Sequence, residues 1–221
     1  MIQVVMDTTT GMTRKEFDAA GITMTPLYVR DDEKLYREQI DIDPEEFYRR
    51  ERTGVIFETA QTNPADLISS FKPILDRGDE IICVLVSGAI SGSVNAAHAA
   101  AQMLGAEDRV SIVDSRESGY GEAYLGLTAR KMAQAGEKRE EIVKALTDIR
   151  ERTRTYFIME SLKWLFHGGR LTGAQYFVGS VIKLNPIVWF DEEGRMVSYD
   201  KTRTIKVAKD RMRQLVGECA K

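Results

Sequence analysis

Short apolar runs alternate with amphipathic stretches along the first part of the chain. Residues 2–6, 81–86 and 110–113 are mostly apolar runs of strand length, a pattern typical of strands buried on both faces of a sheet. Stretches with helical spacing separate them, and residues 139–152 form another, in which Ile142, Val143, Leu146 and Ile149 share one face. Strands that alternate with helices predict an α/β fold whose first part contains a parallel sheet.

The pattern changes near residue 153, after which the segments are shorter. The expected elements of this second part are a strand at 155–159, helices at 161–166 and 172–182, a hairpin of strands 186–190 and 195–199 around the acidic turn 191–194, and a helix at 205–219. We therefore expect two domains, an N-terminal α/β domain over residues 1–152 and a smaller α/β or α+β lobe over residues 153–221.

Three further segments of the first domain have recognisable signals. Residues 22–29 alternate well enough for a single strand, which Pro26 places near a sheet edge. Residues 31–39 predict a hairpin or an irregular excursion. A helix is expected after Asp43, because Asp is a good N-cap and a proline follows at the first helical position. Residues 57–64 predict a loop.

Composition narrows the possible function classes. The 221 residues include 31 basic and 34 acidic side chains, a formal net charge of −3, so no basic excess points to nucleic acid. Two cysteines and two histidines give neither a disulfide framework nor a metal-ligand spacing. No apolar run approaches the length of a membrane span, and the N-terminus lacks the charge and length of a signal peptide. We expect a cytoplasmic protein without a cofactor.

The segment 87–93, Ser-Gly-Ala-Ile-Ser-Gly-Ser, joins the buried run 81–86 to an Ala-rich helix at 94–104. Glycines let a backbone approach a ligand closely, and the unpaired amides of a helix N-terminus favour an anion. No lysine follows the loop, so it is not a nucleotide P-loop. It contains no acid, base or activated nucleophile, which favours holding an anion over transforming one. The alternative is that Ser91 only caps the helix.

Five motifs in order resemble the DegV family of bacterial fatty-acid-binding proteins, some of which are the lipid-binding subunit of fatty acid kinase. They are Asp7-Thr8-Thr9-Thr10, Thr59-Ala60-Gln61-Thr62, the serine loop 87–93, Val113-Asp114-Ser115 and Gly168-Gly169-Arg170-Leu171. The resemblance implies a two-lobed α/β protein that encloses a long-chain fatty acid, such as hexadecanoate, between its lobes. It also implies a separate fatty acid kinase catalytic subunit as a partner, and no enzymatic activity of the chain itself.

The same resemblance implies which residues contact the ligand. Thr59 and Ser91 correspond to the hydroxyls near the carboxylate, Gly92 and Ser93 complete the Ser-Gly-Thr motif with serine in place of threonine, and Arg170 lies near the head group. The Thr-Ser-Gln-Pro motif loses a hydroxyl and its proline here, so we expect a less rigid loop. Family members also continue beyond this length with a Gly-x-His-x-Gly-Pro-Gly segment, and we expect a shortened second lobe.

Several residues keep an alternative interpretation. Thr59 could be an ordinary turn hydroxyl, and Arg170 could form an ion pair between the lobes. Asp7 and Asp114 follow predicted parallel strands, where α/β sheets bind ligands, but a carboxylate would repel a carboxylate. We therefore expect both to form structural hydrogen bonds. The aromatic residues near the glycine turn could pack in a core or line an acyl chain: Trp164, Phe166, Tyr176 and Phe177.

Two rival functions remain open. The expected fold resembles that of dihydroxyacetone kinase subunits, which allows a phosphotransferase or hydrolase. Only His98 and His167 are available as imidazole bases, and no nucleophile–base pair is visible. The second rival is a scaffold that has lost ligand binding.

Overall fold

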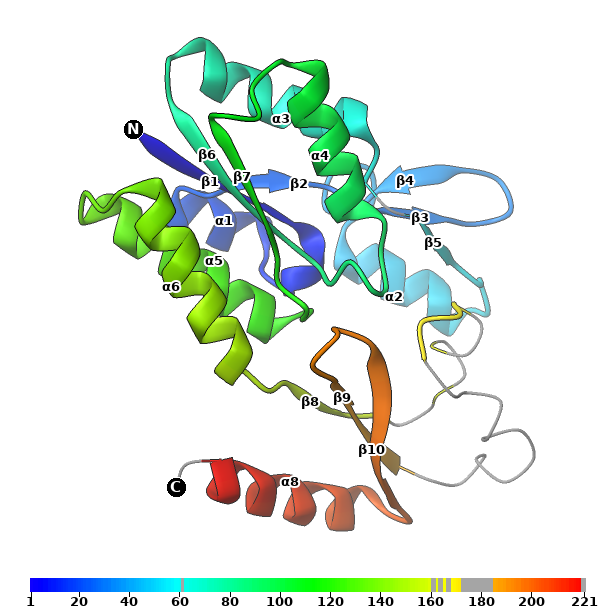
Figure 1. Ribbon diagram of the computed structural model, residues 1–221. Coiled ribbons are helices and arrows are strands. Elements are labelled where there is room, and N and C mark those ends of the chain that lie inside the picture. The colour runs from blue at the N-terminus through cyan, green and yellow to red at the C-terminus, as the bar shows by residue number, and fades with distance from the viewer. Residues whose placement is uncertain (61, 160–161, 163–164, 166–167, 172–184, 220–221) are drawn as a thin grey trace. The chain divides into compact units, whose positions relative to one another are not determined.

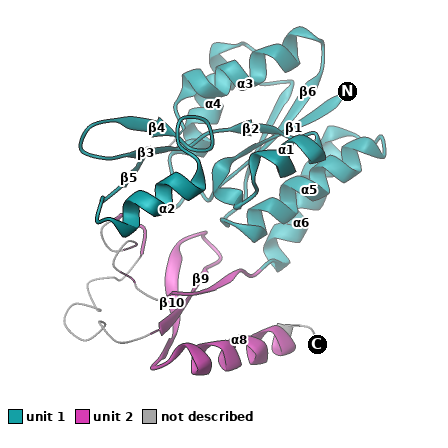
Figure 2. Cartoon of the chain, turned by 180° about the vertical axis from the view of Figure 1, so that it is seen from behind, with its two compact units in different colours: residues 1–153 teal, residues 154–221 magenta. Residues whose placement is uncertain are grey.

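A computed structural model describes residues 1–60, 62–159, 162, 165, 168–171 and 185–219. The chain divides into two compact units, Met1–Thr153 and Arg154–Lys221, which are coloured separately in Figure 2. Of the two helices expected at 161–166 and 172–182, the described residues include only Leu162 and Leu165. His167 and the four aromatic residues near the glycine turn lie outside the described residues.

A parallel four-stranded sheet forms the centre of the first unit (Figure 1). Its strand order is β2-β1-β6-β7, with bounds Thr23–Thr25, Ile2–Asp7, Glu80–Leu85 and Val110–Asp114. The register pairs Val5 with Cys83 and Cys83 with Ile112, so the carboxyl ends of β1, β6 and β7 meet at one edge. This sheet confirms the parallel α/β fold expected for the first part of the chain.

Helices cover both faces of this sheet. On one face, Ile81, Cys83 and Leu85 pack with α3 (Pro64–Asp76) and α4 (Ser93–Met103). On the other face, Ile82 and Val84 pack with three helices, namely α1 (Arg14–Ala20), α5 (Tyr120–Gln134) and α6 (Arg139–Arg152). Burial on both faces explains why β6 is a continuous apolar run with no polar alternation.

A small antiparallel sheet lies beside α2 in the first unit. Its order is β4-β3-β5, with bounds Leu35–Arg37, Tyr28–Arg30 and Glu58–Ala60. The β3–β4 pair is the hairpin that the sequence left open as one of two possibilities. Helix α2 (Pro44–Arg52) begins as predicted, because the Asp43 carboxylate accepts the Glu46 amide at 2.8 Å.

Two expectations for this region are wrong. Residues 22–29 do not form one strand, because β2 and β3 belong to different sheets and Pro26, which has no amide to donate, separates them. Residues 57–64 are not entirely a loop, because β5 pairs with β3 and an Arg30–Glu58 ion pair joins the two strands. Strand β2 does lie at the edge of its sheet, as Pro26 indicated.

The second unit has a three-stranded antiparallel sheet of order β10-β9-β8. The strands are Met196–Thr202, Asn185–Phe190 and Tyr156–Ile158, and α8 (Ile205–Cys219) packs on Ile187 through Ala208 and Leu215. The hairpin predicted around the acidic turn is confirmed. Nowhere in the described part of the chain is a helix both long and apolar enough to cross a membrane.

Candidate functional site

The serine loop runs from the carboxyl end of β6 to the start of α4, where parallel sheets place their ligands. Helix α4 begins at Ser93, and its N-cap is Gly92, which offers no side-chain cap. The Ser91 hydroxyl lies 2.9 Å from the Ser93 hydroxyl and accepts the Ser93 amide at 3.3 Å. Ser91 therefore supports the first turn of the helix without being its N-cap.

The first turn of α4 keeps free donors. The amides of Val94 and Asn95 have no acceptor among the described residues, as expected for the start of a helix. Ser93 is fully buried, whereas Ser91 and Gly92 are partly exposed. If Ser93 donates to Ser91, the Ser91 hydroxyl hydrogen is available for a ligand. Chemically, this arrangement can bind an anion.

Asp7 and Asp114, at the carboxyl ends of β1 and β7, bond to backbone. Asp7 Oδ2 accepts the Val86 amide at 3.0 Å, and Asp114 Oδ1 accepts the Gly88 amide at 3.1 Å. Asp7 therefore holds the residue before the serine loop, and Asp114 holds the second residue of that loop. Their hydrogen bonding to the backbone agrees with the structural role expected for them.

A second carboxyl group, which the sequence analysis did not single out, lies beside Asp7. Glu122 is in the first turn of α5 and is fully buried, with its Oε2 2.5 Å from the Thr9 hydroxyl oxygen. The same hydroxyl lies 2.6 Å from Asp7 Oδ1. Burial raises the pKa of both carboxyls, and the charge of Asp7 raises the pKa of Glu122 further. The only signal in the sequence is a glutamate among the small and apolar residues that begin α5.

One hydroxyl hydrogen cannot serve two carboxylates. Thr9 has a single O–H donor, yet its oxygen is within hydrogen-bond distance of both Asp7 and Glu122. One carboxyl must therefore carry a proton. Glu122 fits that state, because its Oε1 is buried without a hydrogen-bond partner among the described residues, whereas Asp7 accepts two backbone amides.

Thr59 lies in β5, directly opposite Val29 of β3, and is exposed. Nothing in the described ranges hydrogen-bonds it to the serine loop. The segment after it is anchored, because Thr62 is fully buried and its hydroxyl donates to the Pro26 carbonyl at 2.7 Å. This bond anchors the loop at Thr62, and the lower rigidity expected from the loss of the family's proline stays a prediction. Gln61 lies outside the described residues.

Arg170 belongs to the second unit and is partly buried. Its guanidinium donates to the Gly168 carbonyl, and its own amide donates to the Leu165 carbonyl at 3.2 Å. The side chain thus contacts its own glycine turn. Since Thr59 and Ser91 are in the first unit, a role for Arg170 beside them remains a prediction.

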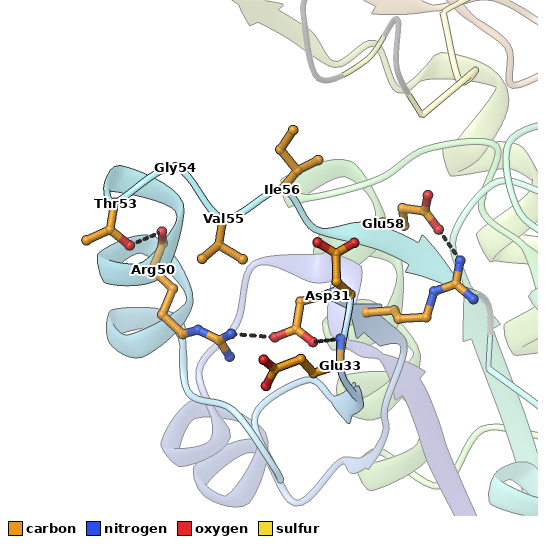
Figure 3. A pocket seen from close by; sticks show the side chains of 10 residues that line it. Asp31, Glu33, Arg50, Thr53, Gly54, Val55, Ile56 and Glu58 are labelled. Atoms are coloured by element: carbon orange, nitrogen blue, oxygen red, sulfur yellow. Dashed lines mark hydrogen bonds and ion pairs between the residues drawn. The ribbon is translucent and has the colours of Figure 1, made fainter.

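Two cavities of the first unit lie around α2 and the small sheet. The larger, of about 720 Å³, is polar: Arg50 reaches from α2 to Asp31, and Arg30 pairs with Glu58 (Figure 3). Burial would raise the pKa of Asp31, but the amides of Glu33 and Lys34 and the Arg50 guanidinium outweigh it and lower the pKa to about 2. The charges cancel within each of these two ion pairs, whereas Asp32 and Glu33 add negative charge to the lining of the cavity.

The smaller cavity, of about 350 Å³, has apolar walls that include Met12, Val29, Ile42 and Phe47. At one end the Thr8 hydroxyl donates to Glu38, whose pKa is raised by burial. Neither cavity is lined by Thr59 or by the serine loop.

Comparison with known proteins gives consistent results along the whole chain. The family described as "Uncharacterised protein, DegV family" matches residues 1–221. Protein DegV of Bacillus subtilis is 33% identical over 223 residues, covering 99% of this chain and 78% of its own length. A DegV domain-containing protein of Caldanaerobacter subterraneus subsp. tengcongensis is 31% identical, covering 94% of this chain and 73% of its own length.

Solved structures agree with the sequence relatives. A DegV family protein from Thermus thermophilus, described by its fatty acid binding, is 28% identical with a TM-score of 0.89, covering 100% of this chain and 78% of that protein. DegV of Bacillus subtilis, described as a fatty acid binding protein, is 32% identical with a TM-score of 0.87. The match covers 98% of this chain and 77% of that protein. The chain belongs to the DegV family.

Proposed function

We propose that this protein binds a long-chain fatty acid and that the serine loop receives the carboxylate. The observation that carries the proposal is the start of α4, where the Ser91 hydroxyl and the free amides of Val94 and Asn95 lie at the carboxyl edge of a parallel sheet. Two relatives above 25% identity, from Thermus thermophilus and Bacillus subtilis, are described as fatty acid binding.

The energetics favour this assignment of roles. A carboxylate taken out of water needs charge-assisted hydrogen bonds, and each such bond contributes about 1.5–3 kcal/mol. The positive end of a helix dipole adds about 0.3–1 kcal/mol. The acyl chain contributes about 0.8 kcal/mol per buried methylene. The acyl chain of the ligand therefore supplies most of the affinity, and the serine loop selects for an acid head group.

Thr59, Gly92, Ser93 and Arg170 complete the proposed site. Gly92 leaves the helix N-terminus uncovered by a side chain, and Ser93 orders the Ser91 hydroxyl. Thr59 supplies a second hydroxyl from the edge strand β5, and Arg170 supplies a positive charge from the second unit.

The head-group claim is tested with two ligands of equal chain length. Lipid-free protein is titrated with hexadecanoate and with hexadecan-1-ol, and the acid should bind at least about tenfold more tightly, since the alcohol lacks the charge. Ser91→Ala should reduce this preference by about tenfold or more. Ser69→Ala, which removes an exposed hydroxyl on α3, is the matched control and should not. Equal affinity for acid and alcohol in the parent protein would contradict the proposal.

We further propose that the bound acid is presented to a separate fatty acid kinase catalytic subunit. The serine loop has no acid, base or lysine, so it can hold the carboxylate but not transfer a phosphoryl group to it. Loaded protein is incubated with ATP, with and without a bacterial fatty acid kinase catalytic subunit. Acyl phosphate should form only with the subunit present. Formation by the loaded protein alone would favour the phosphotransferase alternative.

A further inference from the structure

Two hydrogen bonds tie the serine loop to the end of β7 and to the turn that follows it. The Ser87 amide donates to the Glu117 carbonyl at 2.9 Å, and the Gly88 amide donates to Asp114 Oδ1 at 3.1 Å. The same Asp114 oxygen accepts the Arg116 amide at 2.9 Å. One carboxylate oxygen therefore holds both the backbone that follows β6, at Gly88, and the backbone that follows β7, at Arg116.

The close approach of Asp114 explains the glycine at position 88. A Cβ added to Gly88 would lie 2.9 Å from Asp114 Oδ2 and 3.6 Å from a methyl of Val94. The distance of 2.9 Å from this Cβ to Asp114 Oδ2 is too short for a non-bonded carbon–oxygen contact, so one of the two groups would have to move. The loop backbone and the carboxylate are thus fitted to one another.

The position of Ser91 depends on this attachment. The Ser87 carbonyl accepts the amides of both Ile90 and Ser91 at 3.1 Å. Ser87 is bonded to Glu117 in the turn after β7, and Gly88 is bonded to Asp114 at the end of β7, so these two bonds orient the turn 87–91. A shift of the Gly88 amide would move Ser91 relative to the start of α4.

We propose that Asp114 is a positioning residue for the carboxylate site: its Oδ1 holds the serine loop in the binding geometry, and it does not contact the ligand. This inference rests on the proposed fatty acid function. Holding the loop requires only a hydrogen-bond acceptor at Oδ1. The negative charge of Asp114 does not help binding, because a carboxylate repels a carboxylate ligand.

Two substitutions separate the acceptor from the charge. Asn at position 114 keeps an Oδ1 acceptor for both amides, whereas Ala removes it. Asp114→Ala should weaken hexadecanoate binding about tenfold, and Asp114→Asn should bind as well as the parent or more tightly. Asp108→Ala is the control. Asp108 is exposed and precedes the start of β7, so this substitution removes the same charge away from the serine loop, and the variant should bind like the parent. Parent-like binding by Asp114→Ala, or equal weakening by both variants, would overturn the proposal.

Amide hydrogen exchange in the lipid-free proteins gives a readout that does not depend on the ligand. The Gly88 and Arg116 amides should exchange about tenfold faster in Asp114→Ala and at the parent rate in Asp114→Asn. Unchanged exchange in Asp114→Ala would overturn the positioning role. If the parent protein binds no fatty acid, the proposed function fails while this exchange test still decides what Asp114 does. If Asp114→Ala does not fold, Gly88→Ala, which forces the same two groups apart, is measured against the parent, and unchanged Ser91 exchange and hexadecanoate binding would overturn the proposal.

Discussion

Glu122→Gln should flatten the dependence of stability on pH. The substitution keeps the shape of a buried side chain whose Oε2 lies 2.5 Å from the Thr9 hydroxyl and removes its ionisable proton. In the parent protein, burial and the nearby Asp7 charge hold the pKa of Glu122 well above its usual range. In the variant, the amide at position 122 can donate toward Asp7, whose carboxyl oxygens accept the amides of Thr9 and Val86.

The sign follows from proton binding. Because the folded pKa of Glu122 is raised, the folded protein holds a proton that the unfolded chain loses above about pH 4.3. The parent's contribution from this residue is therefore complete at low pH and falls as pH rises toward the folded pKa. The slope is at most about 1.4 kcal/mol per pH unit for one proton. Across two units this approaches 3 kcal/mol, roughly a third of a typical folding free energy.

Urea denaturation of lipid-free protein at several pH values between about 5 and 8 measures this slope. The parent should lose free energy of unfolding relative to Glu122→Gln as pH rises. Glu137→Gln, at an exposed position after α5, is the control and should run parallel to the parent. Parallel curves for the parent and Glu122→Gln would refute the buried-proton interpretation.

Three further substitutions test separate parts of the structure. Thr62→Val should lower the free energy of unfolding by about 1–3 kcal/mol, since it leaves the buried Pro26 carbonyl without its donor; an unchanged urea midpoint would contradict this. Gly126→Ala should destabilise by about 1–3 kcal/mol in a thermal melt, because its Cβ would lie 2.0 Å from Met6 Sδ; parent-like melting would show that Met6 moves freely. Arg170→Ala should impair hexadecanoate binding clearly and Arg170→Lys mildly, since lysine keeps the charge but loses the planar fork; parent-like titrations of both would remove Arg170 from the site.

Much of the fold follows from local pattern and long-range burial acting together. The run 81–86 could be predicted as a central strand because helices cover both of its faces. The start of α2 could be predicted because Asp43 and Pro44 are sufficient for a cap without any tertiary contact. Elements that depend on a partner distant in the sequence were harder to predict from the sequence. Strand β5 exists because β3 offers it an edge, and no periodicity in three residues reveals that.

In the candidate site, too, features set by the local sequence could be predicted, and features set by distant contacts could not. The serine loop could be found because its glycines and hydroxyls stand between a strand and a helix signal. The N-cap could not be assigned, since Ser91, Gly92 and Ser93 are all acceptable start residues and only the backbone path decides among them. Glu122 was missed because its burial arises from packing against Asp7 and Thr9, which are more than a hundred residues away.

Fatty acid binding by this protein is tested most directly by its own lipid content. The protein is purified from bacteria without added lipid, weighed intact by native mass spectrometry, and extracted under denaturing conditions. We predict one fatty acid of roughly 14 to 18 carbons per chain, a size suited to ligand pockets of a few hundred cubic ångström. A protein that carries no fatty acid and takes up none when hexadecanoate is supplied would contradict the proposed function.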